Sequence, residues 1–188
     1  MSDSAGDREQ SIPLGRSPSE SQAEPDSRLE SNSAKRPLRI SYVDGMRLRR
    51  SILAGIQHVT QDREELDRIN VFPVPDGDTG TNLALTLKSI ADAVRPLDSH
   101  SLSVVADVAA EASVMAARGN SGLLFSRFML TFADLVRGHD RLGSVELAAA
   151  LAGASSSLDD VLENPREGTI ITVARDMAVE AERRAAVG

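Results

Sequence analysis

After residue 37, apolar side chains recur every three or four residues, which is the spacing of helices that bury one face. The clearest sets are Leu48, Ile52, Ile56 and Val59; Leu102, Val105, Ala109 and Ala112; and Phe125, Phe128, Phe132 and Leu135. The pattern predicts six helices, over about 42–67, 80–94, 101–117, 120–138, 143–162 and 169–186. No segment alternates apolar and polar residues as a strand would, and the connections are short. The sequence therefore predicts an all-α antiparallel bundle.

The beginning of the chain has a different composition. Residues 1–36 contain nine serines and three prolines, with no aromatic side chain. Such a segment cannot bury enough apolar surface to offset the entropy lost on ordering. We expect a disordered tail over residues 1–36, followed by a helical domain over residues 37–188.

Composition and charge exclude several classes of protein. The formal net charge of −7 argues against nucleic-acid binding, because proteins that bind nucleic acid generally carry an excess of lysine and arginine. The absence of cysteine excludes disulfides, thiol catalysis and cysteine-ligated metals. There is neither an apolar run of about 20 residues nor a secretory signal. The sequence predicts a cytoplasmic protein with no integral membrane segment.

The first candidate site lies in the connection between the first two predicted helices, which reads NVFPVPDGDTGTN over residues 70–82. Two prolines end the preceding helix and stiffen an extended run. Asp76 and Asp78 follow two positions apart, so their carboxylates can converge on one side of the chain. Two anionic groups at close range favour a cation between them. Asn70 and Asn82 can add neutral oxygen ligands.

The same residues also suit a turn, with Asp78 or Thr79 capping a helix that begins near Gly80. A calcium EF-hand loop beginning at Asp76 does not fit, because its sixth residue is not glycine and its twelfth is not glutamate. Magnesium remains, since it uses one or two carboxylates together with the phosphates of a substrate.

A second candidate site is the connection RGNSG over residues 118–122. A small loop that opens a helix presents free backbone N–H groups at the positive end of the helix dipole, where anions bind. Gly119 and Gly122 would let a phosphate approach the backbone, and Ser121 adds a hydroxyl. The alternative is simple capping, with a C-cap glycine followed by Asn120 or Ser121 as N-cap.

The third connection, PREGT over residues 165–169, opens the last predicted helix, and simple capping by Thr169 is the stronger interpretation there. All three turns precede helices, and they join the first helix to the second, the third to the fourth and the fifth to the sixth. Alternate turns of an up-down bundle lie at the same end. We therefore expect paired carboxylates beside helix N-termini, which is the layout of a magnesium–nucleotide site.

Together the three motifs resemble those of the DhaL-type ATP-binding domain of dihydroxyacetone kinases, in its fatty-acid-kinase branch. The resemblance covers about residues 40–188 and implies an eight-helix antiparallel barrel that binds ATP and two magnesium ions at one end. It assigns the metals to Asp76, Asp78 and Asn70, although the dihydroxyacetone enzymes have an aspartate at about the place of Asn70. It assigns nucleotide contacts to Thr79, Gly80, Thr81, Asn82, Gly119, Asn120, Ser121, Gly122 and, more weakly, Thr169. It implies no catalytic side chain beyond the metal ligands.

The resemblance also implies a function. In the fatty-acid branch this domain is the kinase part of a longer protein, and a separate fatty-acid carrier of the DegV type presents the carboxylate that becomes an acyl phosphate. The chain has no Walker A motif and no protein-kinase signature. Two alternatives stay open, a non-catalytic nucleotide-binding or regulatory module and a dihydroxyacetone (glycerone) kinase-type phosphotransferase. A plain interaction bundle would not need the pair Asp76 and Asp78.

The predicted helices are fewer than the eight of the family's barrel, and the family's glycine-rich closing segment is absent from residues 37–188. We therefore expect a barrel truncated at its C-terminal helices. Apolar faces left uncovered in this way would favour association into a homo-oligomer.

Overall fold

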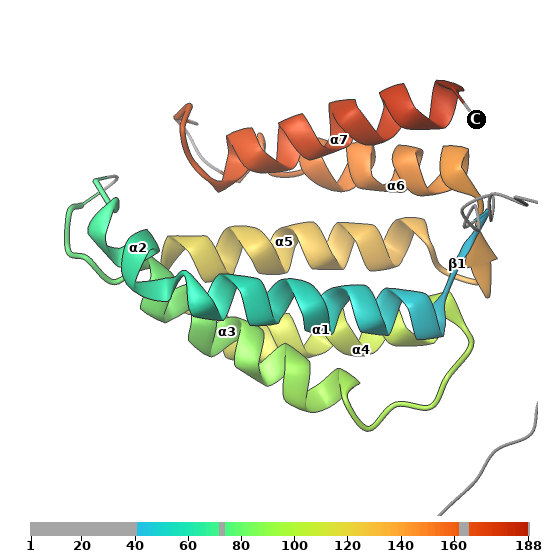
Figure 1. The fold of residues 1–188 in the computed structure, drawn as a ribbon, viewed down its shortest axis with the longest axis horizontal. Helices are drawn as coiled ribbons and strands as arrows, with labels where there is room; N and C mark the ends of the chain where they lie inside the picture. Colours follow the sequence, from blue (N-terminus) through green and yellow to red (C-terminus); the bar gives the residue numbers. More distant parts are fainter. Residues whose placement is uncertain (1–40, 72–73, 162–165, 188) are drawn as a thin grey trace, which may run out of the picture. The chain divides into compact units, whose positions relative to one another are not determined.

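The computed structural model describes residues 41–71, 74–161 and 166–187. The predicted tail over residues 1–36 lies outside the described residues. The described part forms helices α1 Gly45–Gln61, α2 Arg63–Arg68, α3 Thr79–Val94, α4 Leu102–Ala116, α5 Gly119–Leu135, α6 Ser144–Ser156 and α7 Ile170–Val187 (Figure 1). These helices belong to one unit, residues 38–188.

The longer helices run alternately up and down, and helices adjacent in the chain pack against each other from α3 to α7 (Figure 1). Helix α1 lies against α3 and α4. The guanidinium of Arg49 on α1 donates to the carbonyl oxygen of Val94, 3.1 Å away, and ties α1 to the end of α3. The predicted all-α bundle is confirmed.

The core is made mainly of small and aliphatic side chains, and Leu102, Val105 and Ala109 in it belong to a face that the apolar spacing predicted. The side chains with no exposed surface include Val94, Leu102, Val105, Ala106, Ala109, Val136 and Ala154. Alanines line the buried faces of α4 and α6, so neighbouring helices can approach closely. A second, smaller cluster of Leu124, Leu158, Ile171 and Ala174 joins the beginning of α7 to α5.

The first predicted helix, over 42–67, is wrong in two respects: α1 begins only at Gly45, and the chain leaves the helix at Asp62 and begins α2 one residue later. The backbone of Asp62 has φ −91° and ψ 9°, and its N–H bonds to the carbonyl oxygen of His58. The predicted ends of the helices over 120–138 and 143–162 were also too late, since α5 ends at Leu135 and α6 at Ser156.

Two short strands were not predicted. Strand β1, Val43–Asp44, pairs antiparallel with β2, Arg141–Leu142. Two residues are too few to show an alternating pattern, so the sequence carries no signal for them. The pair ties the entrance of α1 to the segment before α6. None of the helices within the described residues combines the length and apolar character that crossing a membrane would need.

Candidate functional site

The three polar connections singled out in the sequence lie at the same end of the helices, at the left of Figure 1. They are the connections α2–α3, α4–α5 and α6–α7. The first two are in direct contact, because the hydroxyl of Ser121 donates to the carbonyl oxygen of Thr79 over 3.4 Å. The third is held beside α5 by the smaller apolar cluster.

The first connection curls so that its asparagine reaches its first aspartate. The Nδ2 of Asn70 donates to Oδ1 of Asp76 at 2.7 Å and to the carbonyl oxygen of Val74 at 3.2 Å. Gly77 follows with φ +68°, a conformation that glycine adopts without steric cost. Asp78 precedes α3, but its side chain makes no capping hydrogen bond. Asp76 and Asp78 are both exposed.

These donors fit a hard divalent cation. In this arrangement the nitrogen of Asn70 faces Asp76, so the amide would have to turn over for its oxygen to join the carboxylates of Asp76 and Asp78 around a metal. Within the described residues no three histidine, cysteine, aspartate or glutamate side chains gather as a metal cluster. A magnesium ion here would therefore complete its octahedral shell with water and substrate phosphates, as magnesium commonly does.

The structure adds an aspartate that the sequence analysis missed. The carboxylate of Asp67, on α2, accepts the backbone N–H of Thr81 at 2.9 Å and the Thr81 hydroxyl at 2.7 Å. These two bonds hold the pKa of the Asp67 carboxyl below its ordinary value of 3.8. No sequence signal joins residues 14 positions apart in this way. The contact depends on α2 folding back onto α3.

The glycines of the second connection are explained by close packing. Gly119 has φ +58°, and a Cβ there would lie 2.9 Å from Nδ2 of Asn82. A Cβ at Gly122 would lie 2.7 Å from Oγ1 of Thr86. That hydroxyl is buried and accepts the backbone N–H of Arg118 at 3.2 Å. The beginning of α5 is thereby held against α3, which places Asn82 beside the second connection.

The first turn of α5 has backbone N–H groups that the helix itself does not pair. Arg118 stands at the N-cap without a side-chain capping bond. The first intrahelical bond runs from the N–H of Gly122 to the carbonyl of Arg118. The N–H groups of Gly119, Asn120 and Ser121 therefore have no acceptor within the helix, as is usual at a helix beginning. This end carries positive potential and suits a phosphate.

Gly80, by contrast, is buried, and a Cβ there would strike the carbonyl oxygen of Arg63 and the Cβ of Leu66. Its missing side chain lets α3 lie on α2. Thr79 is half-buried, and its carbonyl oxygen accepts the hydroxyl of Ser121 in the second connection.

The third connection is built as a cap. The hydroxyl of Thr169 donates to the carbonyl oxygen of Arg166 at 2.8 Å and accepts the N–H of Ile171 at 3.3 Å. Glu167 accepts the hydroxyl of Thr172 at 2.8 Å and the guanidinium of Arg175 at 2.6 Å. The capping interpretation of Thr169 thus accounts for its hydroxyl. The proline of this motif, residue 165, lies outside the described residues.

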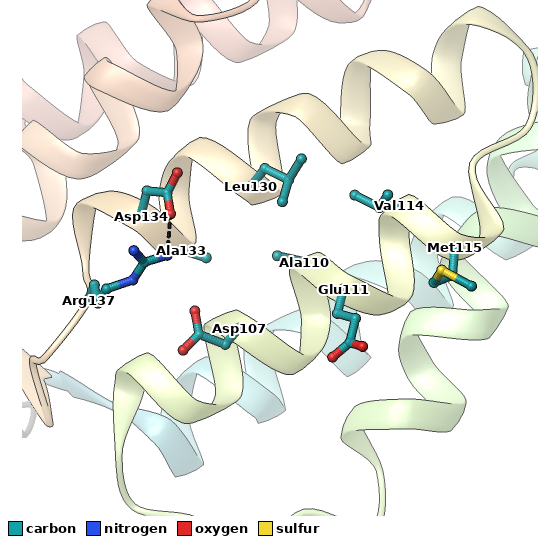
Figure 2. A pocket seen from close by; sticks show the side chains of 9 residues that line it. All are labelled: Asp107, Ala110, Glu111, Val114, Met115, Leu130, Ala133, Asp134 and Arg137. Atoms are coloured by element: carbon teal, nitrogen blue, oxygen red, sulfur yellow. Dashed lines mark hydrogen bonds and ion pairs between the residues drawn. The ribbon is translucent and has the colours of Figure 1, made fainter.

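Grooves on the described helices include the following two. One, of about 860 Å³, runs between α1 and α3 from Leu53 and Arg95 to Thr81 and Arg63, and so reaches the candidate site. The other, of about 280 Å³, lies between α4 and α5. Its lining includes the acidic Asp107 and the exposed Met115 (Figure 2), and no residue of the three connections contributes to it.

Comparison with known proteins gives the family. Residues 73–188 match the model of the DAK2 domain. The chain belongs to the DAK2 domain family. That family includes kinase subunits and binds ATP with magnesium, which supports the DhaL-like part of the resemblance.

Longer proteins carry the same domain. The chain is 38% identical over 142 residues to protein YloV of Bacillus subtilis. It is 33% identical over 146 residues to uncharacterized proteins of Staphylococcus saprophyticus and Staphylococcus haemolyticus. These matches cover 76% to 78% of this chain but 26% of each relative, so the chain spans about a quarter of the length of the curated relatives it matches.

Proposed function

We propose that this DAK2 domain binds ATP with magnesium and serves phosphoryl transfer to the carboxylate of a fatty acid held by a separate carrier protein of the DegV type. The observation that carries the proposal is the arrangement around Asp76. Its carboxylate is held by Asn70 at 2.7 Å, with the carboxylate of Asp78 uncapped two residues on. The open N-terminus of α5 lies at the same end of the bundle.

Each part of this end has a distinct task in the proposed reaction. When bound, magnesium supplies charge neutralisation of the ATP phosphates. Asp76, Asp78 and the amide oxygen of Asn70 hold the metal, and the N–H groups at the beginning of α5 orient phosphate oxygens. In the transfer, an oxygen of the acyl carboxylate forms a bond to the γ-phosphorus while the bond from that phosphorus to ADP breaks. The protein contributes positioning and electrostatics rather than covalent chemistry.

A non-catalytic nucleotide-binding module is the second candidate. It is favoured by the donor set that the resemblance implies, because Asn70 supplies an amide at about the place where the dihydroxyacetone enzymes have a carboxylate. Two carboxylates suffice to hold a magnesium nucleotide, whereas a weaker metal cluster would stabilise the transition state less. The two candidates differ in turnover and not in binding.

The test is thermal unfolding of the full chain with ATP, in the presence and absence of magnesium. Ligand at 100 times its Kd adds about 2.7 kcal/mol to stability. That corresponds to a rise in Tm of about 5 to 10 °C for a chain of this size. We expect Asp76→Ala and Asp78→Ala each to abolish the magnesium-dependent rise while the far-UV circular dichroism stays at parental intensity.

Asp98→Ala is the matched control, because this exposed acid lies in the α3–α4 connection at the other end of the bundle. It removes the same charge and should keep the parental rise. A parental rise in either Asp76→Ala or Asp78→Ala would show that the metal assignment is wrong. Phosphate transfer to an acyl-loaded carrier, measured with the parent, then separates the two candidates.

A further inference from the structure

The groove of about 280 Å³ between α4 and α5 has an apolar floor and exposed apolar walls (Figure 2). Ala110 and Ala133 form the floor, and their small side chains, each 3% exposed, leave a hollow between the two helices. Val114 and Leu130 border this hollow and are 45% and 39% exposed. Such a surface is removed from water only when a side chain of another molecule fills it.

The α4 side of the groove carries two acids without counter-charges. Asp107 and Glu111 lie one turn apart on α4, and both are exposed. Neither carboxylate has a hydrogen bond or an ion pair with any of the described residues, and α4 itself contains no basic residue. Like charges at this spacing on a helix destabilise it. A cation supplied by a partner would turn this repulsion into attraction.

The charges on the α5 side are already paired. The guanidinium of Arg137 lies 2.5 Å from the carboxylate of Asp134, and both residues line the groove. The lining thus holds three acids and one arginine, a net charge of −2 that comes from the two acids of α4. Charge complementarity therefore selects a positively charged partner.

The spacing of the lining residues suits a helix as the partner. They recur at three- and four-residue intervals, at 107, 110, 111 and 114 on α4 and at 130, 133, 134 and 137 on α5. A third helix laid along two others places its side chains into the spaces between residues at these intervals. An aliphatic side chain of such a helix would lie over Ala110 and Ala133, and basic side chains one turn away would reach the two acids.

We propose that the groove between α4 and α5 is a docking site for a basic amphipathic helix of a partner protein. An aliphatic side chain of that helix fills the hollow, and its lysine or arginine side chains pair with Asp107 and Glu111. The docking site is distinct from the candidate nucleotide site, because none of the three polar connections lines it. Binding of the helix does not depend on nucleotide.

The test uses the full chain and a synthetic peptide of about 20 residues, which as a helix is long enough to span the 15 residues of α4. The peptide has leucine at three- and four-residue intervals along one face and lysine on both sides of that face. A control peptide has the same composition, with its leucines distributed around the helix. In fluorescence anisotropy at about 0.1 M salt, the amphipathic peptide should bind at least about 10-fold more tightly, since burial of one leucine suffices for that difference.

Variants of the chain test the two acids and the apolar wall. Asp107→Asn combined with Glu111→Gln should weaken binding of the amphipathic peptide by about 3- to 30-fold, the range for two exposed ion pairs. The Tm of this variant should not fall, because a like-charge repulsion is removed. Asp176→Asn combined with Glu182→Gln is the matched control, since it removes two exposed acids from α7 and should bind as the parent does. Leu130→Ala shortens one wall and should weaken binding by about 10-fold.

Met115 reports where the peptide binds, because its side chain lines the groove and is 83% exposed. In NMR spectra of methyl-labelled methionine, its signal should shift during the titration while that of Met177, on α7, stays in place.

Several results would overturn the proposal. They are a parent that binds neither peptide, equal affinity for the two peptides, parental affinity in the variant without the two acids, and an unmoved Met115 signal. A dimer of the chain alone, measured by light scattering and dissociated by Leu130→Ala, would also overturn it, because a second copy would then occupy the groove.

Discussion

Thr86 joins α3 to the connection that opens α5, and removing its hydroxyl is a direct test of how this end is built. The side chain has no exposed surface. Its Oγ1 lies 3.0 Å from the carbonyl oxygen of Asn82 and 3.2 Å from that of Ala116, and it accepts the N–H of Arg118 at 3.2 Å. One hydroxyl thus links two helices and the turn between α4 and α5.

Thr86→Val keeps the volume of the side chain and removes only these bonds. The N–H of Arg118 then loses its acceptor, while the carbonyl of Asn82 keeps its ordinary helical partner. Arg118 is exposed and the lost bonds are part-buried, so water can replace the lost partner in part. Losing a hydrogen bond of this kind costs about 0.5 to 1.5 kcal/mol. For a chain of this size, each kcal/mol lowers Tm by about 2 to 4 °C. We expect Tm to fall by about 1 to 6 °C.

The assay is thermal unfolding without ligand, followed by far-UV circular dichroism. Thr60→Val is the matched control, because that hydroxyl is exposed and donates only to Ile56 of its own helix, at 2.8 Å. Its effect should stay within about 0.5 kcal/mol. Thr86→Ser keeps the hydroxyl and should retain the link. A Thr86→Val protein as stable as the parent, or a Thr60→Val protein equally destabilised, would refute this account.

Two further predictions concern backbone fit and pH. Gly45→Ala should lower Tm, because its Cβ would lie 2.5 and 2.6 Å from two carbonyl oxygens of the α3–α4 connection. Gly55→Ala, with no atom within 4 Å, should raise Tm by about 2 to 4 °C, and a change of the same sign in both variants would contradict this. Thr172 and then Arg175 hold the pKa of Glu167 below 4.5. Glu167 therefore stabilises the fold above pH 4.5 and loses this effect as the pH falls through its lower folded value. Glu167→Gln should lower Tm at pH 7, and the difference from the parent should narrow toward pH 3; a constant difference would refute it.

The helices could be predicted because burial alone accounts for them. Leu102, Val105 and Ala109 are fully buried and fall on one predicted apolar face, whereas Leu135, predicted to share a face with Phe132, is 49% exposed at the end of its helix. The break at Asp62 could not be predicted, because the residues around it are polar on all sides and show no period that would end there. The helix that follows the break, α2, packs on Gly80 of α3, a contact between segments that the local sequence does not show.

The candidate site, too, could be predicted from the sequence only in part. Asn70, Asp76 and Asp78 could be predicted as a group, because their chemistry is local to one loop. The contacts from Asp67 to Thr81 and from Thr86 to the second connection could not, since they span 14 and 32 positions. Such pairs form only after helices have packed, and no local pattern records them.

At this end of the bundle, the neutral hydroxyl groups and the charged carboxylates have different surroundings. The hydroxyls of Thr81, Thr86 and Thr169 are all used in structural hydrogen bonds. The carboxylates of Asp76 and Asp78, two positions apart in the chain, both stay exposed, and their negative charges repel an approaching phosphate. Free ATP should therefore be disfavoured here, and the magnesium complex should be the form that binds. Magnesium dependence of binding thus distinguishes this arrangement from a simple anion site at the beginning of α5, which would accept free ATP as well.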